Sequence, residues 1–205
     1  MLELQSISKT FHPGTIHAKK ALQNLSLSLN SGDFVTVIGG NGAGKSTLLN
    51  AIAGVWPVDE GNILIDGVDV TGLPEYKRAA FIGRVFQDPM LGTAPNMQIE
   101  ENLALALRRG KKRTLRWGVT KQEREDYYER LHALGLGLEK RMTDKVGLLS
   151  GGQRQALTLL MASLQKPKLL LLDEHTAALD PATAAKVLEL SDKIVEENGL
   201  TALMI

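Results

Sequence analysis

The residues best suited to chemistry lie in a glycine-rich stretch, GGNGAGKS, at positions 39–46. Its spacing is that of a phosphate-binding loop, in which backbone N–H groups surround an anion at the start of a helix. In such a loop Lys45 reaches the terminal phosphates, and the Ser46 hydroxyl suits Mg²⁺. The stretch therefore predicts a site for a nucleoside triphosphate with Mg²⁺, rather than a turn that only reverses the chain. The residues assigned to the nucleotide here are Gly39, Gly40, Asn41, Gly42, Ala43, Gly44, Lys45, Ser46 and Thr47.

A second candidate is the acidic pair Asp173 and Glu174, which ends the apolar run LLLLDE at positions 169–174. At the end of a strand, Asp173 would hold Mg²⁺ through water, and Glu174 would act as a general base toward the attacking water. The alternative is that two acids simply end a buried strand where it meets solvent. Their occurrence after a phosphate-binding loop favours the catalytic interpretation and predicts an NTPase.

Both candidates need strands and helices to hold them, and the sequence supplies these in alternation. FVTVIG at 34–39 is a continuous apolar run typical of a buried strand, and a helix is expected from about Lys45 to Ala53. Residues 180–198 predict a helix with Asp180 as N-cap and Pro181 at its first position. Strands alternating with helices predict an α/β core with a parallel sheet. The helical composition from about 90 to 150 predicts an inserted lobe.

The composition excludes several classes of function. The 205 residues carry a net charge of +1, which gives no reason to expect binding to nucleic acid or to a membrane surface. There is no cysteine, so disulfides, thiolate zinc sites and cysteine nucleophiles are excluded. The first residues do not read as a signal peptide, and no apolar run approaches the roughly 20 residues needed to span a bilayer. We expect a cytoplasmic protein.

The pentapeptide LSGGQ at 149–153 narrows the class of NTPase. With the glycine loop, Gln87 and Asp173 in this order, the sequence resembles the nucleotide-binding subunit of an ABC transporter over essentially its whole length. The resemblance implies that the pentapeptide meets the γ-phosphate bound on a second copy of the chain. A helix start with exposed N–H groups and little side-chain bulk fits this role. The alternative is an ordinary serine-capped helix. The signature residues are Ser150, Gly151, Gly152 and Gln153.

Further roles follow from the resemblance alone. Gln87 matches the glutamine that contacts Mg²⁺ and water and couples the site to a membrane partner. Asp180 matches the acidic residue that lies across the dimer interface, and Phe11 occupies the place of the aromatic ring that stacks on adenine. A buried core phenylalanine is the alternative for Phe11. His175 follows Glu174 where many relatives have proline, and we expect it to be a packed or capping residue.

The resemblance also implies a switch histidine just beyond the strand LTALMI, where the chain ends at Ile205. The histidines present are His12, His17, His132 and His175. Because the last residues form an apolar strand, we expect a truncated chain rather than one that naturally lacks this residue. We therefore expect this polypeptide to bind the nucleotide, whereas the absence of the histidine puts its turnover of ATP in question.

The implied fold is that of an ABC ATPase, an α/β P-loop NTPase core with a mostly parallel sheet, an N-terminal antiparallel β portion and an inserted helical lobe. We expect one domain over residues 1–205, with the core at about 1–88 and 151–205 and the lobe at about 89–150. The basic stretch at 108–116 is read as a solvated loop of this lobe, or else as a contact for lipid headgroups or an acidic partner.

The function implied is an ATP-binding and ATP-hydrolysing subunit that uses Mg²⁺, dimerises around ATP and drives transport through a separate membrane permease. Residues 83–106 and 173–181 look like those of bacterial amino-acid uptake systems, in which a substrate-binding protein also takes part. Such a subunit lies on the inner face of the membrane through its permease. Two alternatives stay open at this point, a soluble ABC ATPase outside transport and a nucleotide-dependent regulatory switch.

Overall fold

The structure is a computed structural model, and it describes residues 1–111 and 118–205. Contacts group these residues into two units. Unit 1 comprises residues 1–83, 167–173 and 199–205, and unit 2 comprises residues 84–166 and 174–198. The sequence-based boundaries instead assigned all of 151–205 to the core, and they stay a prediction.

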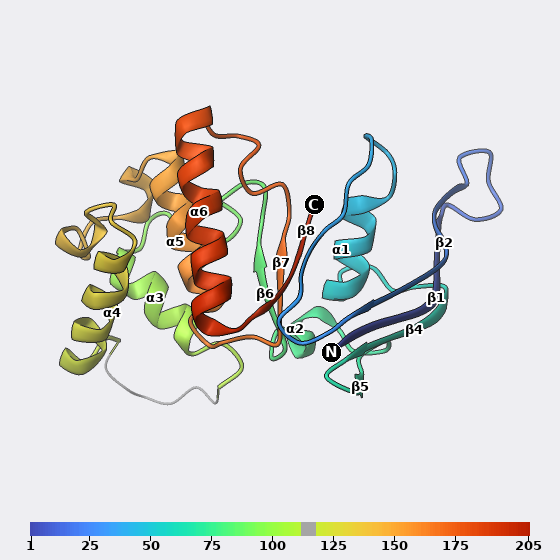
Figure 1. The fold of residues 1–205 in the computed structure, drawn as a ribbon, viewed down its shortest axis with the longest axis horizontal. Helices are drawn as coiled ribbons and strands as arrows, with labels where there is room; N and C mark the ends of the chain where they lie inside the picture. Colours follow the sequence, from blue (N-terminus) through green and yellow to red (C-terminus); the bar gives the residue numbers. More distant parts are fainter. Residues whose placement is uncertain (112–117) are drawn as a thin grey trace. The chain divides into compact units, whose positions relative to one another are not determined.

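Unit 1 contains an antiparallel sheet in the strand order β2-β1-β4-β5. The strands are β1 (Leu2–Phe11), β2 (Lys19–Leu29), β4 (Glu60–Ile65) and β5 (Val68–Asp69). Along β1 the side chains of Leu2, Leu4 and Ile7 are buried, because alternate residues of a strand face the core. They belong to one cluster with Leu49 and Ile52 of helix α1 (Lys45–Ala53), which lies next to these strands (Figure 1).

A second sheet has the strand order β3-β8-β7-β6. Its strands are β3 (Phe34–Thr36), β8 (Thr201–Met204), β7 (Leu169–Leu172) and β6 (Ile82–Val85). Strand β8 pairs in parallel with both β3 and β7. The four leucines of β7 are fully buried, as a continuous apolar run predicts. Together the two sheets and the helices confirm the predicted α/β fold class.

The expectation that FVTVIG forms a buried strand is wrong. Strand β3 covers three residues, and Phe34 is 36% exposed while Ile38 beyond it is 91% exposed. The physical reason is position in the sheet, because among the described residues β3 pairs only with β8 and so forms an edge. An apolar run cannot by itself distinguish a central strand from an edge strand.

Unit 2 is largely helical, and its helices gather together in Figure 1. They are α3 (Ile99–Leu107), α4 (Lys121–Ala133), α5 (Gly151–Ser163) and α6 (Pro181–Asn198), with single 3₁₀ turns at Leu138–Lys140 and Val146–Leu148. Unit 1 adds the short helix α2 (Glu75–Arg78). In the described part of the chain, none of the helices combines the length and hydrophobicity needed to cross a membrane.

Candidate nucleotide-binding site

The glycine loop connects β3 to α1, the context that the motif requires. Gly44 is the N-cap of α1 with a φ of 90°, a conformation that favours glycine. A Cβ on Gly44 would also overlap the carbonyl oxygen of Ala21 in β2. Glycine is therefore needed here for both backbone conformation and space. No side chain caps this helix start, so its first N–H groups are available to an anion.

Lys45 lies over the same loop. Its Nζ donates hydrogen bonds to the carbonyl oxygens of Gly39 at 2.8 Å and Gly40 at 3.3 Å. The Ser46 side chain that follows is exposed at the first turn of α1. The structure thus brings the ammonium, the hydroxyl and the loop N–H groups together at one helix start, which is the chemistry of a phosphate site.

The far end of α1 is fixed by a buried arginine. Arg78 is 2% exposed, and its Nη1 donates to the carbonyl oxygens of Ala51 at 2.7 Å and Ile52 at 2.8 Å. Its Nη2 and Nε donate to the carbonyl oxygens of Thr71 and Leu73, each at 2.8 Å. A cation at a helix C-terminus interacts favourably with the helix dipole. Arg78 therefore stabilises the helix that carries the phosphate loop.

Phe11 is half-buried and lies at the end of β1, outside the buried core of unit 1, so the interpretation as a core phenylalanine is wrong. Its ring meets that of Trp56 edge to face, with the centroids 4.9 Å apart and the planes at 82°. Because it is only half-buried, part of this ring remains accessible for stacking on a base. The role of Phe11 at adenine stays a prediction.

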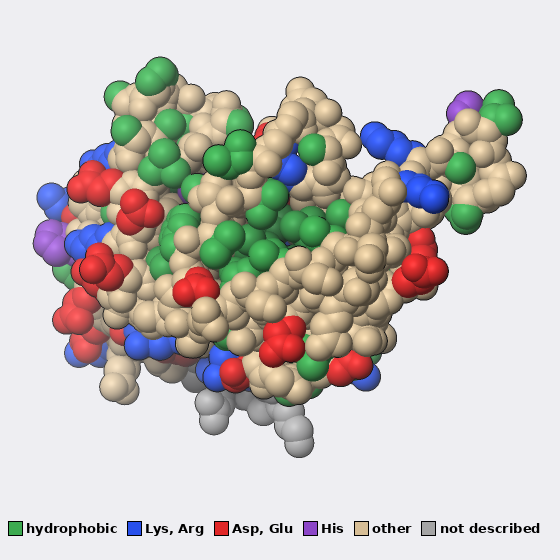
Figure 2. Space-filling view, turned by 45° about the vertical axis from the view of Figure 1, so that its right-hand side comes forward, with side chains coloured by type: hydrophobic (Ala, Val, Ile, Leu, Met, Phe, Trp, Pro, Cys, Tyr) green, Lys and Arg blue, Asp and Glu red, His purple; other side chains and the backbone are tan. Residues whose placement is uncertain are grey.

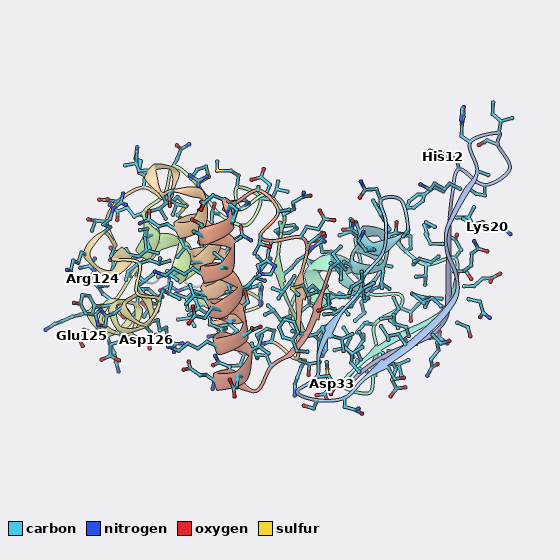
Figure 3. The ribbon with its side chains drawn as sticks, turned by 45° about the horizontal axis from the view of Figure 1, so that its top comes forward. His12, Lys20, Asp33, Arg124, Glu125 and Asp126 are labelled. Atoms are coloured by element: carbon cyan, nitrogen blue, oxygen red, sulfur yellow. The ribbon has the colours of Figure 1, made fainter. Side chains whose placement is uncertain are left out.

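Lys19 is a candidate that the sequence did not reveal. It pairs with Phe11 across the β1–β2 hairpin, and its Nζ lies 3.8 Å from the position that a Cβ on Gly42 would take. This places an exposed ammonium against the phosphate loop and connects the loop to the strand end that bears Phe11. Lys20 follows in β2 and projects away from α1 (Figure 3), as side-chain alternation requires. Figure 2 shows basic side chains at the base of the projecting hairpin.

Asp173 directly follows β7 and is half-buried. With Ser46, which is also in unit 1, it offers the hard oxygen donors that Mg²⁺ prefers in company with phosphate and water. Over residues 1–111 and 118–205, no group of three His, Cys, Asp or Glu side chains is arranged to hold a metal ion by itself. This donor set fits an ion that arrives with a nucleotide.

Glu174 begins the turn after Asp173 and has a φ of 40°. This left-handed conformation costs a residue with a side chain about 1 kcal/mol. The turn closes when the Ala177 N–H donates to the Glu174 carbonyl oxygen at 3.0 Å. Strain at a carboxylate after a buried strand is consistent with a position held for function.

His175, the next residue, is packed, as predicted. It is 2% exposed, and its Nε2 lies 2.9 Å from the Ser191 Oγ of α6. Because the Ser191 hydroxyl donates to the Val187 carbonyl oxygen, the Ser191 oxygen accepts from the imidazole, which places the proton on Nε2. Burial lowers the pKa of His175 to about 4, against a smaller raising effect of Asp192. A neutral imidazole at neutral pH serves packing here.

The signature residues start helix α5 in unit 2. The Ser150 hydroxyl accepts a hydrogen bond from the Gln153 N–H at 3.3 Å, and the Gln153 Oε1 accepts one from the Ser150 N–H at 3.2 Å. This is a capping box, so Ser150 caps α5. The role of the signature at a nucleotide bound on a second copy stays a prediction. Ser150 and Gly151 are exposed, and the Gly151 N–H, which the capping box does not use, remains open to an anion.

Gly152 has a packing role within this chain, and its predicted role at a second copy stays a prediction. It is buried, and a Cβ there would overlap Cγ2 of Thr183 in helix α6. Low bulk at this position therefore serves the close packing of α5 on α6. Gly151 is exposed and can meet a partner through its backbone, and a Cβ there would lie 3.3 Å from Leu179 Cδ2.

Asp180 caps α6. Its Oδ1 accepts a hydrogen bond from the Thr183 N–H at 3.1 Å, which confirms the predicted N-cap. Hydrogen bonds from Thr183 lower the pKa of this carboxyl below its ordinary value. The additional role of Asp180 at a dimer interface stays a prediction.

Gln87 lies two residues beyond the end of β6 at Val85, and its side chain is exposed. The predicted site residues therefore fall into two groups. Unit 1 holds Phe11, the phosphate loop and Asp173, and unit 2 holds Gln87, Glu174, the signature and Asp180.

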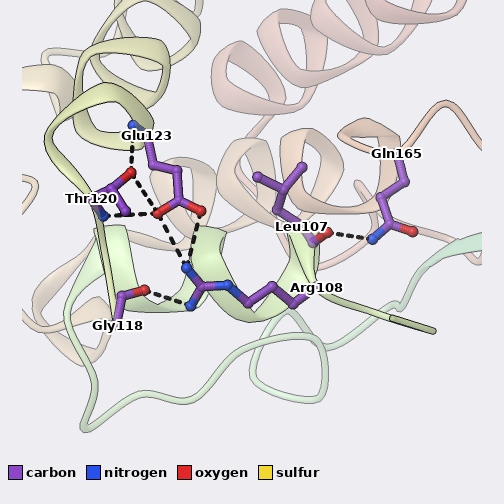
Figure 4. A network of polar contacts seen from close by, with 6 residues as sticks. All are labelled: Leu107, Arg108, Gly118, Thr120, Glu123 and Gln165. Carbon is purple, nitrogen blue, oxygen red and sulfur yellow. Dashed lines mark hydrogen bonds and ion pairs between the residues drawn. The ribbon is translucent and has the colours of Figure 1, made fainter. Parts of the chain in front are cut away.

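The basic stretch is partly internal. Arg108 Nη2 donates to both carboxylate oxygens of Glu123, at 3.0 and 3.1 Å, and Nη1 donates to the Gly118 carbonyl oxygen (Figure 4). Burial lowers the pKa of the Arg109 guanidinium. Because Arg108 is paired and Arg109 is half-buried, neither is a free surface cation, and the interpretation of this stretch as a contact for lipid headgroups is weakened. Lys112, Arg113, Arg116 and Trp117 lie outside the described residues.

Comparisons with known proteins agree with this chemistry. Residues 22–177 match the family model described as ABC transporter, a span that contains the glycine loop, Gln87, the signature and both acidic residues. The "Tyrosine transport ATP-binding protein" of Clostridioides difficile (strain R20291) is 47% identical over 205 residues, covering all of this chain and 81% of that protein.

Two further similarities were found. The "Spermidine/putrescine import ATP-binding protein PotA" of Pasteurella multocida (strain Pm70) is 38% identical over 182 residues, but this chain spans only 44% of its length. A solved dimeric ATP-binding cassette in a post-hydrolysis state, bound to ADP and Pi, superimposes with a TM-score of 0.82. It is 33% identical, and the match covers all of this chain and 87% of that one.

Proposed function

The chain belongs to the ABC transporter family, and we propose that it binds and hydrolyses ATP with Mg²⁺ as one of two copies that close around the nucleotide. The observation that carries this proposal is the pair of open helix starts. The α1 start carries Lys45 and Ser46, and the α5 start carries Ser150 and an exposed Gly151. Each start can bind phosphate oxygens through N–H groups.

In the proposed mechanism the two starts act on the same ATP from different chains. The phosphate loop and Lys45 of one copy hold the β- and γ-phosphates, while Phe11 stacks on adenine. Ser150 and Gly151 of the other copy approach the γ-phosphate. Ser46, Asp173 and Gln87 would hold Mg²⁺, which would neutralise charge on the phosphates. Glu174 accepts a proton from water as the water oxygen bonds to the γ-phosphorus and the bond from that phosphorus to the β–γ bridging oxygen breaks. Release of the phosphate lets the copies separate.

We propose that this cycle drives uptake of an amino acid through a separate membrane permease. The subunit would lie on the inner face of the membrane, bound to that permease. The tyrosine transport relative supports an amino-acid system with an aromatic cargo. A substrate-binding protein would deliver the cargo. The subunit described here would contribute ATP chemistry and pass the movement on through Gln87.

The experiment that tests this proposal is the molar mass by light scattering with and without ATP, using Glu174→Gln to prevent turnover. We expect the mass to rise from about that of the 22.3 kDa chain to that of a dimer only when ATP is present. ADP serves as the control and should leave the monomer. A chain that binds ATP by calorimetry yet stays monomeric at concentrations well above its ATP Kd would contradict the proposal.

A further inference from the structure

Gln155 is a buried amide on α5 to which the proposed mechanism gives no role. The side chain is 1% exposed, and its Nε2 donates to the Phe86 carbonyl oxygen at 3.3 Å. Phe86 directly precedes Gln87, the residue assigned to Mg²⁺ and water. A buried polar side chain needs its partner, so this hydrogen bond holds the backbone immediately before Gln87 to α5.

Helix α5 also contacts the segment after Gln87. A Cβ on Gly92 would lie 3.0 Å from Thr158 Cγ2, so Gly92 lies directly against the helix. Between these points, Arg154 Nη1 lies 2.8 Å from Met90 Sδ. The Arg84 guanidinium stacks over the Phe86 ring at 4.7 Å. All of these contacts lie within unit 2.

Residues 86–92 therefore contact α5 near both ends, and the exposed side chain of Gln87 lies between these contacts. Gln155 holds residue 86 by a hydrogen bond, and residue 92 lies against Thr158, one helical turn further along α5. The same helix begins at the signature residue Gly151, and Gln155 follows it by one turn. The α5 start and the backbone before Gln87 are therefore connected through one helix.

We propose that Gln155 is a positioning residue that fixes the backbone immediately before Gln87 and links it to the signature start of α5. This inference rests on the proposed function, because it needs Gln87 to act on the metal and the water. It predicts an effect on metal dependence and turnover that loss of packing alone would not give.

The test is Gln155→Met, which keeps side-chain length and removes the amide donor. We expect kcat to fall about tenfold and the Mg²⁺ concentration for half-maximal turnover to rise several-fold, with the ATP KM changed less than about twofold. The matched control is Gln165→Met. Gln165 Nε2 also donates to backbone carbonyl oxygens, those of Ala106, Leu107 and Arg109, of which Figure 4 shows Leu107. This control should lower Tm and leave the Mg²⁺ dependence unchanged.

A double-mutant cycle with Gln87→Ala separates the possible outcomes. If Gln155 acts through Gln87, Gln155→Met should have no further effect on Mg²⁺ dependence in the Gln87→Ala protein. If Gln87→Ala shifts the Mg²⁺ dependence but Gln155→Met behaves like Gln165→Met, the inference is overturned while the proposed function stands. Effects that simply add also overturn it. If Gln87→Ala itself changes nothing, the role proposed for Gln87 fails, and the inference fails with it.

Discussion

Replacing Glu174 by glutamine is expected to lower ATP turnover by about 10²- to 10⁴-fold, the usual contribution of a positioned general base. Glutamine has the same shape and no basic carboxylate, so the left-handed turn at this position should be retained. ATP affinity should change little, because Glu174 is proposed to act on the attacking water rather than on the nucleotide. The measurement is phosphate release at saturating ATP and Mg²⁺, with ATP binding determined separately.

The matched control for this prediction is Glu196→Gln, an exposed carboxylate on α6. It should leave both turnover and binding within about twofold of the original protein. Turnover of Glu174→Gln that stays at the level of this control would remove Glu174 from the catalytic role, whatever its effect on dimerisation.

Three lysines of unit 1 should give a graded series in ATP affinity. Lys45→Met should weaken binding by about 100-fold, since hydrogen bonds to charged groups contribute about 1.5–3 kcal/mol each. Lys19→Met should weaken it about three- to tenfold, as expected for an exposed charge at some distance from the phosphates. Lys20→Met is the control and should change nothing, because its side chain projects away from α1 (Figure 3).

Calorimetric titration with ATP, ADP and AMP at two salt concentrations would check this series. The Lys19 effect should decrease as phosphates are removed and as salt rises, because it is electrostatic. Equal losses for Lys19→Met and Lys20→Met would mean that only the overall charge matters. Unchanged affinity in Lys45→Met would contradict the assignment of the phosphate loop.

Features encoded within a short stretch could be predicted from the sequence. The helix that follows the glycine loop has the expected bounds, Lys45–Ala53, because the loop and the apolar periodicity both mark it. Asp180 caps α6, with Pro181 as the first residue of that helix, since caps depend on neighbours three residues away. The α/β class followed from the alternation of such elements.

Features that depend on contacts between distant residues could not be predicted. Phe34 is exposed because β3 lies at the edge of its sheet, and a single apolar run does not reveal the order of the strands in a sheet. Gly152 is small because Thr183, far along the chain, packs against it. No sequence pattern distinguishes Lys19 from other surface lysines, and only the β1–β2 hairpin of the structure places its ammonium beside Gly42. Gln155 gave no motif signal at all.

The most direct test of the central claim is to mix two inactive variants, because the claim is that each ATP lies between the phosphate loop of one copy and the signature of another. Lys45→Met disables the loop. Gly151→Asp places a carboxylate at the exposed start of α5, where it suits the helix dipole but repels a phosphate. A dimer of one copy of each contains one site with both parts intact and one with both parts defective.

We predict that each variant alone turns over little ATP and that an equal mixture recovers about a quarter of the original activity, from random pairing in a two-fold symmetric dimer. No recovery on mixing, although both variants are folded and Gly151→Asp still binds ATP, would contradict a site shared between two chains.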